Sequence, residues 1–474
     1  MVPAAPLYLL AGAALTLGGL KFGPSLAWTG SDTPSFRGPA TAPNSAAPDA
    51  TAWDALRMIL QQWEFTSEYA VVVGDATHGR LFTYEGGNFT LKTKIPTGST
   101  SKWPSAMMFA GLVADGSVKL LDDPVYNYLP WWTQDRQRSL VVPSKWRRVY
   151  HDVFCHQAPL FVEKRAAPQD PADPRSTVTF RMLLSFTSGF GDGHPGEEAN
   201  TLAGRKWRDA NRENVTALSA RRLEKITPCN QMIGSVVGCA KHIYETVKLI
   251  GKPGTVYSYN SNHLQLAAAV AVTVTGLDIQ QVIKKYLVEP YNMTDSAYPG
   301  RCPDFGGDLF TTGADYEKFL AALLGYKTLN KPLIAASEED STPFMKDMYT
   351  LYGDYGFGHF LMCFDSVKGF TKECEEAQCH MDPGAFGFIP LYDRKNNYYM
   401  QVVAAEIPPT GSYPLSGIPE YLAMAIKPHV DAIMTGKVSG NPMEQLSHNP
   451  SLLSLSLSDV NYCLSCKLHP KQCS

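Results

Sequence analysis

The chain has 474 residues and a net charge of −3. Hydrophobic residues make up 44% and charged residues 18%, which is enough apolar material for a large core and excludes a wholly disordered chain. Acidic and basic residues are nearly equal in number, and the sequence contains no basic stripe, so we expect no nucleic-acid partner. The length suits roughly two to four ordinary domains, or one large α+β unit.

The N-terminal segment, residues 1–27, is typical of an export signal. Residues 1–20 carry no charge, and Ser25-Leu26-Ala27 offers small residues of the kind that a signal peptidase reads. We expect a cleaved signal peptide and a protein that is secreted or lies in the secretory-pathway lumen. An uncleaved signal anchor is the alternative, and only then would the protein be membrane-anchored. An apolar terminus without a targeting role is the third possibility.

The rest of the chain divides by composition. Residues 28–51 are rich in Pro, Ala, Ser and Thr and predict a flexible linker. Residues 52–440 form the main domain, with polar insertions at 131–175 and 191–254 that are long enough to act as lids or pocket walls. Residues 441–474 form a polar C-terminal tail with three cysteines.

Apolar periodicity predicts the elements of the main domain. In chain order we expect a helix at 53–63, strands at 69–74 and 81–84, a helix at 101–114, helices at 264–274, 279–287 and 316–324, and strands at 384–392 and 398–405. Strands near both ends of the domain enclose a helical middle. This order predicts an α+β fold, in which an antiparallel β-sheet is flanked by helices and stands beside an all-α lobe.

Cysteines and sequons agree with export. The ten cysteines are an even number and would pair in an oxidising compartment. Sequons at Asn88, Asn214 and Asn292 indicate a glycoprotein if a eukaryotic cell secretes the chain. The alternative for one cysteine cluster, a zinc site, would use Cys363, Cys374, Cys379 and His380. Their spacing fits no common zinc pattern, so we expect no metal.

One segment, Gly98-Ser99-Thr100-Ser101-Lys102, carries the chemistry. On the first turn of a helix, residues three apart share a face, so the Ser99 hydroxyl and the Lys102 amine should lie side by side. Serine becomes a nucleophile when a base takes its proton, and lysine can be that base if burial lowers its pKa. By itself this spacing is weak, because it arises by chance about once or twice in a chain of this length. A solvated lysine at a helix start is the alternative.

Five later segments follow this one in an order that is known from one superfamily. They are residues 112–130 (LVADGSVKLLDDPVYNYLP), 181–190 (RMLLSFTSGF), 253–262 (PGTVYSYNSN), 306–312 (GGDLFTT) and 384–388 (GAFGF). Together with Ser99-x-x-Lys102 they resemble the serine β-lactamase and penicillin-binding protein superfamily. The resemblance is closest to its class C β-lactamase and family VIII esterase branch, and it covers residues 52–434. It implies that family's fold and an acyl-enzyme mechanism.

The resemblance also implies catalytic roles. Ser99 matches the nucleophile and Lys102 matches its base. Tyr259 matches the tyrosine that shares the proton with the lysine and passes it to the leaving group, a role that a lowered phenol pKa would suit. Backbone N–H groups of Ser99 and of Ala385, which follows Gly384, would form the oxyanion hole.

Two departures from the family pattern concern substrate binding. The second motif is usually Tyr-x-Asn, whereas here Ser261 stands in the Asn position and Asn262 comes one residue later, so either could bind substrate. The third motif usually has Lys or His two residues before its glycine, Gly384, and Asp382 stands there instead. Either Asp382 occupies that place or His380 takes the role after a small insertion. The alternative for His380 is a surface histidine.

These departures bear on the substrate. An aspartate at the third motif would repel the carboxylate that β-lactams carry, which argues against a dedicated β-lactamase. We therefore expect a serine hydrolase acting as an esterase, or as an acyl transferase, on small or medium acyl groups. A β-lactamase or D-amino-acid-type peptidase is the alternative, and a catalytically silent binding or assembly protein is the alternative of another class. The sequence shows no nucleotide or dinucleotide motif, and we expect no cofactor.

Overall fold

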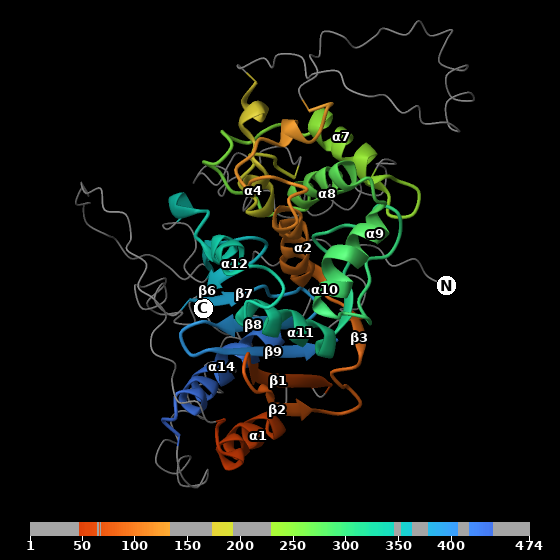
Figure 1. The fold of residues 1–474 in the computed structure, drawn as a ribbon. Helices are drawn as coiled ribbons and strands as arrows, with labels where there is room; N and C mark the ends of the chain where they lie inside the picture. The colour runs from red at the N-terminus through yellow and green to blue at the C-terminus, as the bar shows by residue number, and fades with distance from the viewer. Residues whose placement is uncertain are drawn as a thin grey trace, which may run out of the picture.

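The computed structural model describes residues 47–63, 66, 68–132, 173–192, 229–345, 352–362, 378–405 and 417–438. In this part of the chain a seven-stranded antiparallel sheet has the order β2-β1-β9-β8-β7-β6-β5 (Figure 1). Its strands are β1 (Tyr69–Asp75), β2 (Gly79–Glu85), β5 (Tyr352–Tyr355), β6 (Phe360–Met362), β7 (Cys379–Met381), β8 (Phe388–Asp393) and β9 (Tyr398–Ala404). A separate pair joins β3 (Lys94–Pro96) to β4 (Phe310–Thr312). Because β1 pairs with β9, the two ends of the domain meet within the large sheet.

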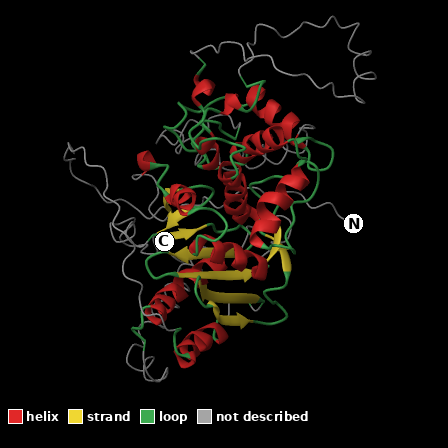
Figure 2. Ribbon diagram, viewed as in Figure 1, coloured by secondary structure: helices red, strands yellow, loops and turns green. Residues whose placement is uncertain are grey.

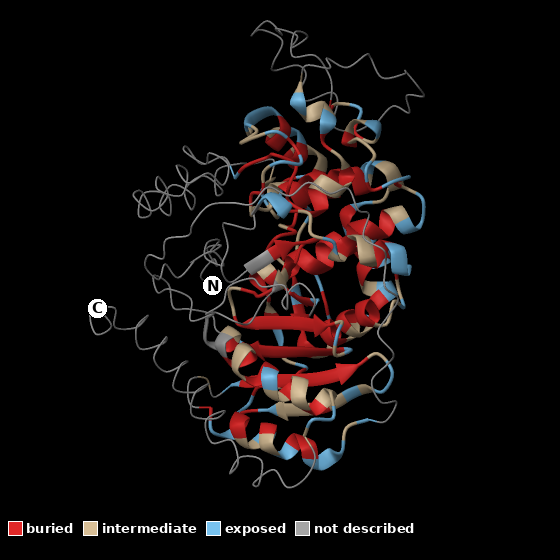
Figure 3. Cartoon of the chain, turned by 90° about the vertical axis from the view of Figure 1, so that its left-hand side faces the viewer, coloured by how far each residue is buried: buried red, intermediate tan, exposed pale blue. Residues whose placement is uncertain are grey.

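Helices cover both faces of this sheet. Every residue of β9 is buried, which fits a strand that is packed on both sides (Figure 3). Gln401 donates to the Gly313 carbonyl of α11 (Gly313–Leu324), whereas Tyr398 donates to Asp431 of α14 (Gly417–Met434). Since alternate residues of a strand point to opposite faces, α11 and α14 lie on opposite sides of the sheet. Helix α1 (Asp54–Gln61), preceded by the 3-10 helix η1 (Ala50–Trp53), packs beside α14.

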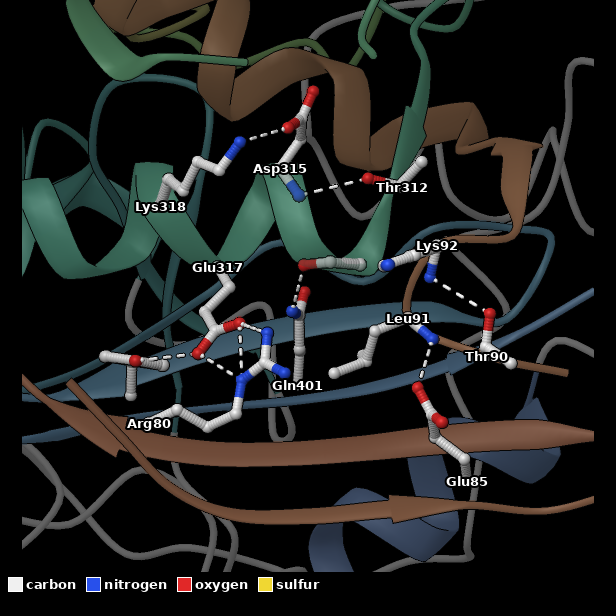
Figure 4. A network of polar contacts seen from close by, with 12 residues as sticks. Arg80, Glu85, Thr90, Leu91, Lys92, Thr312, Asp315, Glu317, Lys318 and Gln401 are labelled. Atoms are coloured by element: carbon white, nitrogen blue, oxygen red, sulfur yellow. Dashed lines mark hydrogen bonds and ion pairs between the residues drawn. The ribbon is translucent and has the colours of Figure 1, made fainter. Parts of the chain in front are cut away.

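An ion pair between a partly exposed arginine and a buried glutamate fixes α11 to the edge of the sheet. Arg80 of β2 bonds to both carboxylate oxygens of Glu317 (Figure 4). Tyr399 of β9 donates to the same carboxylate over 2.9 Å. The contact of Arg80 with Glu317 joins residues 237 positions apart in the sequence. Helix α11 in turn supports the strand pair β3–β4, which leads into the segment that carries Ser99.

The helical lobe stands at one end of the sheet (Figure 2). Its helices are α2 (Lys102–Ala114), α4 (Phe180–Leu184), α7 (Val236–Thr246), α8 (Asn262–Thr275), α9 (Ile279–Ile283), α10 (Glu289–Tyr291) and α12 (Lys331–Glu338). Short turns of helix occur at η2 (Gly98–Ser101), η3 (Val125–Asn127), η6 (Pro174–Thr177), η8 (Lys284–Val288) and η9 (Pro343–Met345), of which η8 is a π-helix. Helix α2 is buried along almost its whole length, because it lies between α8, α4 and α12.

The α+β fold class predicted from the sequence is confirmed. The strand expected at 384–392 begins only at Phe388, because Gly384 to Gly387 forms a turn closed by a 3.1 Å backbone bond. Helix α14 lay beyond the last element assigned from the sequence. No single described helix is long and apolar enough to cross a membrane. The pair α8 and Ile279–Tyr291 passes that test only jointly, with a bend of 95°.

The structure describes part of each of the two insertions that were expected from the sequence, residues 131–175 and 191–254. Within 191–254, Cys229 and Cys239 form a disulfide, and α7 packs against α8, so this stretch contributes to the helical lobe. Cys302 and Cys379 are buried free thiols. The other cysteines lie outside the described residues: Cys155, Cys363, Cys374, Cys463, Cys466 and Cys473. So do the signal segment, most of the linker, most of residues 131–175, and the tail.

Candidate active site

The turn before α2 holds the serine and the lysine together. Gly98 has a φ of +61°, a left-handed conformation that favours glycine, and a Cβ there would meet the Phe386 ring at 3.2 Å. From this turn the chain passes through η2 directly into α2. The Lys102 Nζ lies 3.2 Å from the Ser99 Oγ. The pair therefore lies side by side, as its spacing predicts.

The residues around Ser99 are fixed to both parts of the fold. The Thr100 hydroxyl lies 2.8 Å from the carbonyl oxygens of Asp382 and of Phe388, so it ties the turn to the sheet. The Ser101 hydroxyl accepts the backbone N–H of Leu309 over 3.0 Å, which ties the turn to β4. These bonds hold the backbone of η2 from two directions.

Lys102 is buried, and no carboxylate of the described residues is in ion-pair contact with it. The residue is 3% exposed, and its Nζ donates to the Gly306 carbonyl over 2.7 Å. The same nitrogen lies 4.4 Å from the centre of the Tyr259 ring. Burial lowers the pKa of Lys102 to about 8, although the charges of Asp382 and Asp304 oppose the shift. The amine therefore exchanges its proton near neutral pH.

Tyr259 completes the group from the segment before α8. Its ring is partly exposed and packs against Phe360, while its hydroxyl is buried and has no hydrogen bond of ordinary geometry with the described residues. Burial and the nearby Asp382 raise its pKa well above the usual value, although the adjacent Ser99 hydroxyl lowers it. The lowered phenol pKa expected from the sequence is wrong, because desolvation and the Asp382 carboxylate outweigh the effect of the Ser99 hydroxyl. Tyr259 is a neutral phenol that can give or relay a proton.

The second-motif candidates point to different places. A Cβ on Gly306 would lie 2.3 Å from the Ser261 Oγ, so the Ser261 hydroxyl packs against the residue whose carbonyl binds Lys102. The Asn262 side chain donates to the Gly191 carbonyl over 2.7 Å. The structure therefore brings Ser261, rather than Asn262, against the residue whose carbonyl binds the lysine.

His380 lies apart from these groups. It is 1% exposed, so the alternative of a surface histidine is wrong. Its Nδ1 lies 3.0 Å from His359 Nε2, and its ring packs against Tyr392. Burial lowers its pKa well below the usual value. None of its described contacts is with the Ser99 and Lys102 pair.

Gly384 and Ala385 lie against the serine turn. A Cβ on Gly384 would meet the Thr97 carbonyl at 2.2 Å, so only glycine permits this approach. The Ala385 nitrogen lies 3.4 Å from the position that a Gly98 Cβ would take. Its N–H has no acceptor among the described residues. A free backbone donor thus stands beside the nucleophile turn.

Sequence reasoning missed the turn at residues 304–308. Asp304 accepts the N–H of Gly306 over 2.7 Å, and this Asx turn presents the Gly306 carbonyl to Lys102. Gln231, next to the disulfide, donates to Asp308 over 2.9 Å and braces the same turn. The Asp-x-Gly-Gly pattern predicts a turn, but it does not show that a carbonyl of this turn binds Lys102. In the described part of the chain, no cluster of three or more His, Cys, Asp and Glu residues could hold a metal.

Comparisons with known proteins place the chain in a family. Residues 57–387 match the family model described as beta-lactamase. A search of curated proteins found no significant match. A putative beta-lactamase from Bacteroides dorei is 19% identical, with a TM-score of 0.51, over 82% of this chain and 99% of that one. Unliganded simvastatin synthase (LovD) from Aspergillus terreus is 15% identical, with a TM-score of 0.52, over 81% and 99%.

A further similar structure is EstCE1, titled a hydrolase with promiscuous acyltransferase activity. It is 14% identical, with a TM-score of 0.51, over 78% of this chain and 98% of that one. At such identities each structural likeness shows the fold alone. The family model spans well over half of the chain, and its match begins in α1 and ends at the turn beside Ser99. The resemblance inferred from the sequence is confirmed, and the chain belongs to the beta-lactamase family.

Proposed function

We propose that this protein is a serine hydrolase that works through an acyl-enzyme on Ser99 and acts on esters of small or medium acyl groups. The observation that carries the proposal is the buried Lys102 amine, 3.2 Å from the Ser99 Oγ. A lysine in water is almost fully protonated at neutral pH and cannot accept a proton. A pKa of about 8 leaves part of the Lys102 population neutral and able to act as a base.

The acylation step follows from this arrangement. The Ser99 Oγ attacks the ester carbonyl while the Lys102 Nζ takes the hydroxyl proton. The oxyanion that forms accepts the backbone N–H groups of Ser99 and Ala385. The neutral Tyr259 phenol relays the proton from Lys102 to the departing alkoxide, which leaves as an alcohol. The acyl group remains on Ser99.

Deacylation uses the same groups in reverse. Water, or a second alcohol, gives its proton to Lys102 through Tyr259 and attacks the acyl-enzyme carbonyl. The C–O bond to Ser99 breaks, and the serine oxygen regains the proton. An acid is released when water attacks, and a new ester is released when an alcohol attacks. The similar structures include a synthase and a hydrolase with promiscuous acyltransferase activity, which supports testing both outcomes.

Covalent labelling tests the proposal. Wild-type protein is incubated with a fluorophosphonate and, separately, with a fluorescent penicillin, and any adduct is located by mass. We expect the fluorophosphonate to label Ser99, and p-nitrophenyl esters to be hydrolysed. Ser99→Ala should abolish both signals, whereas Ser117→Ala, beyond the other end of α2, should change neither.

Two outcomes contradict the proposal. Labelling by the penicillin together with rapid turnover of β-lactams would show an amide or lactam enzyme instead of an esterase. No label with either probe, and a Ser99→Ala variant equal to wild type in every assay, would leave a binding protein with this fold. Adding a primary alcohol to the ester assay measures transfer, because the new ester then competes with the free acid.

We also propose that the protein matures in the secretory pathway. The Cys229–Cys239 disulfide supports an oxidising compartment. The sequon residues Asn88 and Asn292 are both exposed and accessible to glycosylation. Expression in secreting eukaryotic cells, followed by glycosidase treatment and N-terminal sequencing, tests this proposal. Retention in the cytosol with no change of mass would contradict it.

A further inference from the structure

The amine of the site has a fixed acceptor on one side and the serine hydroxyl on the other. The Lys102 Nζ donates to the Gly306 carbonyl over 2.7 Å and lies 3.2 Å from the Ser99 Oγ. A neutral amine has two N–H groups and one lone pair. The carbonyl engages one N–H, which limits rotation of the amine about its Cε–Nζ bond. The position of Gly306 therefore decides whether the lone pair faces the serine hydroxyl.

The other groups around Lys102 do not replace this carbonyl. Among the described residues, its amine has hydrogen bonds only to Ser99 and Gly306. Tyr259 presents its ring, with the centre 4.4 Å from the Nζ, and a ring face does not select one rotation of the amine. Asp304 and Asp382 act on the charge of Lys102 and favour its protonated form, so they do not direct the lone pair either.

The Gly306 carbonyl belongs to a turn that is closed by two aspartate side chains. The Asp304 Oδ1 accepts the Gly306 N–H over 2.7 Å, and the Asp304 carbonyl accepts the N–H of Asp308 over 2.8 Å. The Asp308 Oδ2 in return accepts the backbone N–H of Asp304 over 2.7 Å. The Asp308 carboxylate thus joins the two ends of the turn.

One glutamine outside the turn binds it and the segment before it. The Gln231 Nε2 donates to the Asp308 Oδ2 over 2.9 Å, the same oxygen that closes the turn. The Gln231 carbonyl accepts the N–H groups of Arg301 over 2.8 Å and of Cys302 over 3.1 Å. Gly300, with a φ of +86°, permits this approach, because a Cβ there would lie 2.4 Å from the Gln231 carbonyl oxygen.

Gln231 lies in a loop that is closed by a disulfide. Cys229 and Cys239 are ten positions apart, and their bond links the residues before Gln231 to α7. Helix α7 packs against α8, which follows the segment that carries Tyr259. A cross-link limits how far the enclosed residues can move, so the disulfide keeps the half-buried Gln231 at the turn.

Building on the function proposed above, we propose that Gln231 is a positioning residue for the Lys102 base and that the Cys229–Cys239 disulfide holds it in place. Four hydrogen bonds of 2.7–2.9 Å join the glutamine to the amine, through Asp308, Asp304 and Gly306. Loss of the first bond loosens the turn, and the lone pair of the amine is then no longer held toward the serine. The base remains buried but acts less often.

Gln231→Ala tests the side chain alone, because the disulfide and both backbone bonds remain. Fluorophosphonate labelling of the folded protein is followed between pH 6 and about 10, where Lys102 loses its proton. The rate plateau at high pH should fall by about tenfold, since a misdirected amine takes the serine proton poorly. The midpoint should move to lower pH, because the loosened carbonyl stabilises the ammonium less. A role in stability alone predicts fewer folded molecules with an unchanged profile.

Gln280→Ala is the matched control. Gln280 donates to the carbonyls of Tyr298 over 2.9 Å and of Gly300 over 2.8 Å, so it binds the same segment before the turn begins. This variant should change neither plateau nor midpoint. Gln231→Glu keeps the size of the side chain and replaces its donor by an acceptor, so it should lose the plateau as alanine does. It decides the question if Gln231→Ala does not fold.

Cys229→Ala combined with Cys239→Ala tests the disulfide. This double variant should also lower the plateau, and adding Gln231→Ala should lower it little further, because both changes break the same contact. Losses that multiply, or an unchanged plateau in the double variant, overturn the role of the disulfide. If the double variant does not fold, wild type is reduced stepwise and alkylated. Alkylation of the two cysteines, located by mass, should then track the loss of the plateau, and a plateau that outlasts it overturns that role.

The remaining outcomes separate this inference from the proposed function. Wild type that is never labelled at any pH contradicts the function itself. Wild type that is labelled, with plateau and midpoint unchanged in the Gln231 variants, overturns the role of Gln231 alone. An equal fall of the plateau in Gln280→Ala overturns it as well, because general loosening of residues 298–308 would then account for the loss.

Discussion

Two lysines of this protein are buried to nearly the same degree and have opposite chemistry. Lys102 is 3% exposed and Lys427 is 6% exposed. The Lys102 amine contacts a carbonyl and a hydroxyl, and burial lowers its pKa to about 8. The Lys427 amine lies 2.7 Å from Asp393 and 2.9 Å from Asp431. Burial opposes its charge, but the acidic groups around it prevail and raise its pKa.

The difference shows that burial by itself does not make a lysine reactive. The groups in contact with the desolvated amine decide whether it keeps its proton. Two carboxylates compensate for the lost hydration of the charged form, whereas a backbone carbonyl does not. Lys427 holds α14 to the sheet through Asp393 of β8. Lys102 keeps a proton that it can release.

The largest effect expected is on catalysis in Lys102→Met. Acylation of Ser99 should fall by about 10²–10⁴-fold, because the general base is gone. The free energy of unfolding at pH 7 should stay within roughly 1–2 kcal/mol of wild type, since relief of a buried charge offsets the lost bond to Gly306. Fluorophosphonate labelling rates and urea unfolding measure the two quantities. An active variant would contradict the role of the lysine.

The reverse pattern is expected for Lys427→Met. The free energy of unfolding should fall by about 3–5 kcal/mol, because Asp393 is left buried without its cation. The labelling rate of the folded fraction should not change. Urea unfolding at pH 7 measures the loss. Adding Asp393→Asn to Lys427→Met should recover part of it, and a loss below about 1 kcal/mol in the single variant would show that the ion pair is dispensable.

Tyr259→Phe sharpens the contrast within the active site. The ring over Lys102 is kept and the hydroxyl is removed, so turnover should fall by about 10²-fold while the pH at which activity rises stays near 8. Stability should not fall, because the buried hydroxyl has no hydrogen bond of ordinary geometry with the residues that the structure describes. Steady-state ester hydrolysis between pH 6 and about 10 measures the turnover rate and the pH at which activity rises. A shifted profile with full activity would contradict a role in proton relay.

The last prediction concerns the dependence of stability on pH. The folded pKa of Lys102, about 8, lies below its ordinary value of 10.5. Below pH 8 both the folded and the unfolded chain hold the proton, and the penalty of a buried charge is fully present. Between pH 8 and 10.5 only the unfolded chain keeps it, so stability rises with pH. Wild type should gain stability over this range relative to Lys102→Met, and parallel curves would contradict it.

The local part of the site was predictable from the sequence. Helical geometry fixes the relation of Ser99 to Lys102, because three residues span one turn. Family landmarks placed Tyr259 near them without any spacing argument. Four strands of the sheet, β1, β2, β8 and β9, followed from runs such as Tyr69 to Val73, which is apolar throughout and buried on both faces, whereas β5, β6 and β7 were not predicted.

The predictions that were wrong or missing depend on contacts between segments that lie far apart in the sequence. The direction of the Tyr259 pKa shift depends on burial of its hydroxyl and, second, on Asp382, which is far away in the sequence. The place of His380 depends on a turn that brings His359 against it. Helix α14 has apolar residues four apart, but Pro428 within it argues against a helix. Lys427 stands in no motif, so nothing in the sequence marked it as buried.

The clamped turn at η2 has a consequence for the timing of the reaction. Thr100 and Ser101 have their hydroxyl groups engaged before any substrate arrives. The Ser99 Oγ is itself held by the Lys102 Nζ over 3.2 Å, so the ordering of the nucleophile is completed during folding and not during each encounter. An incoming acyl group thus meets a reactant that is already as restrained as one within a single small molecule.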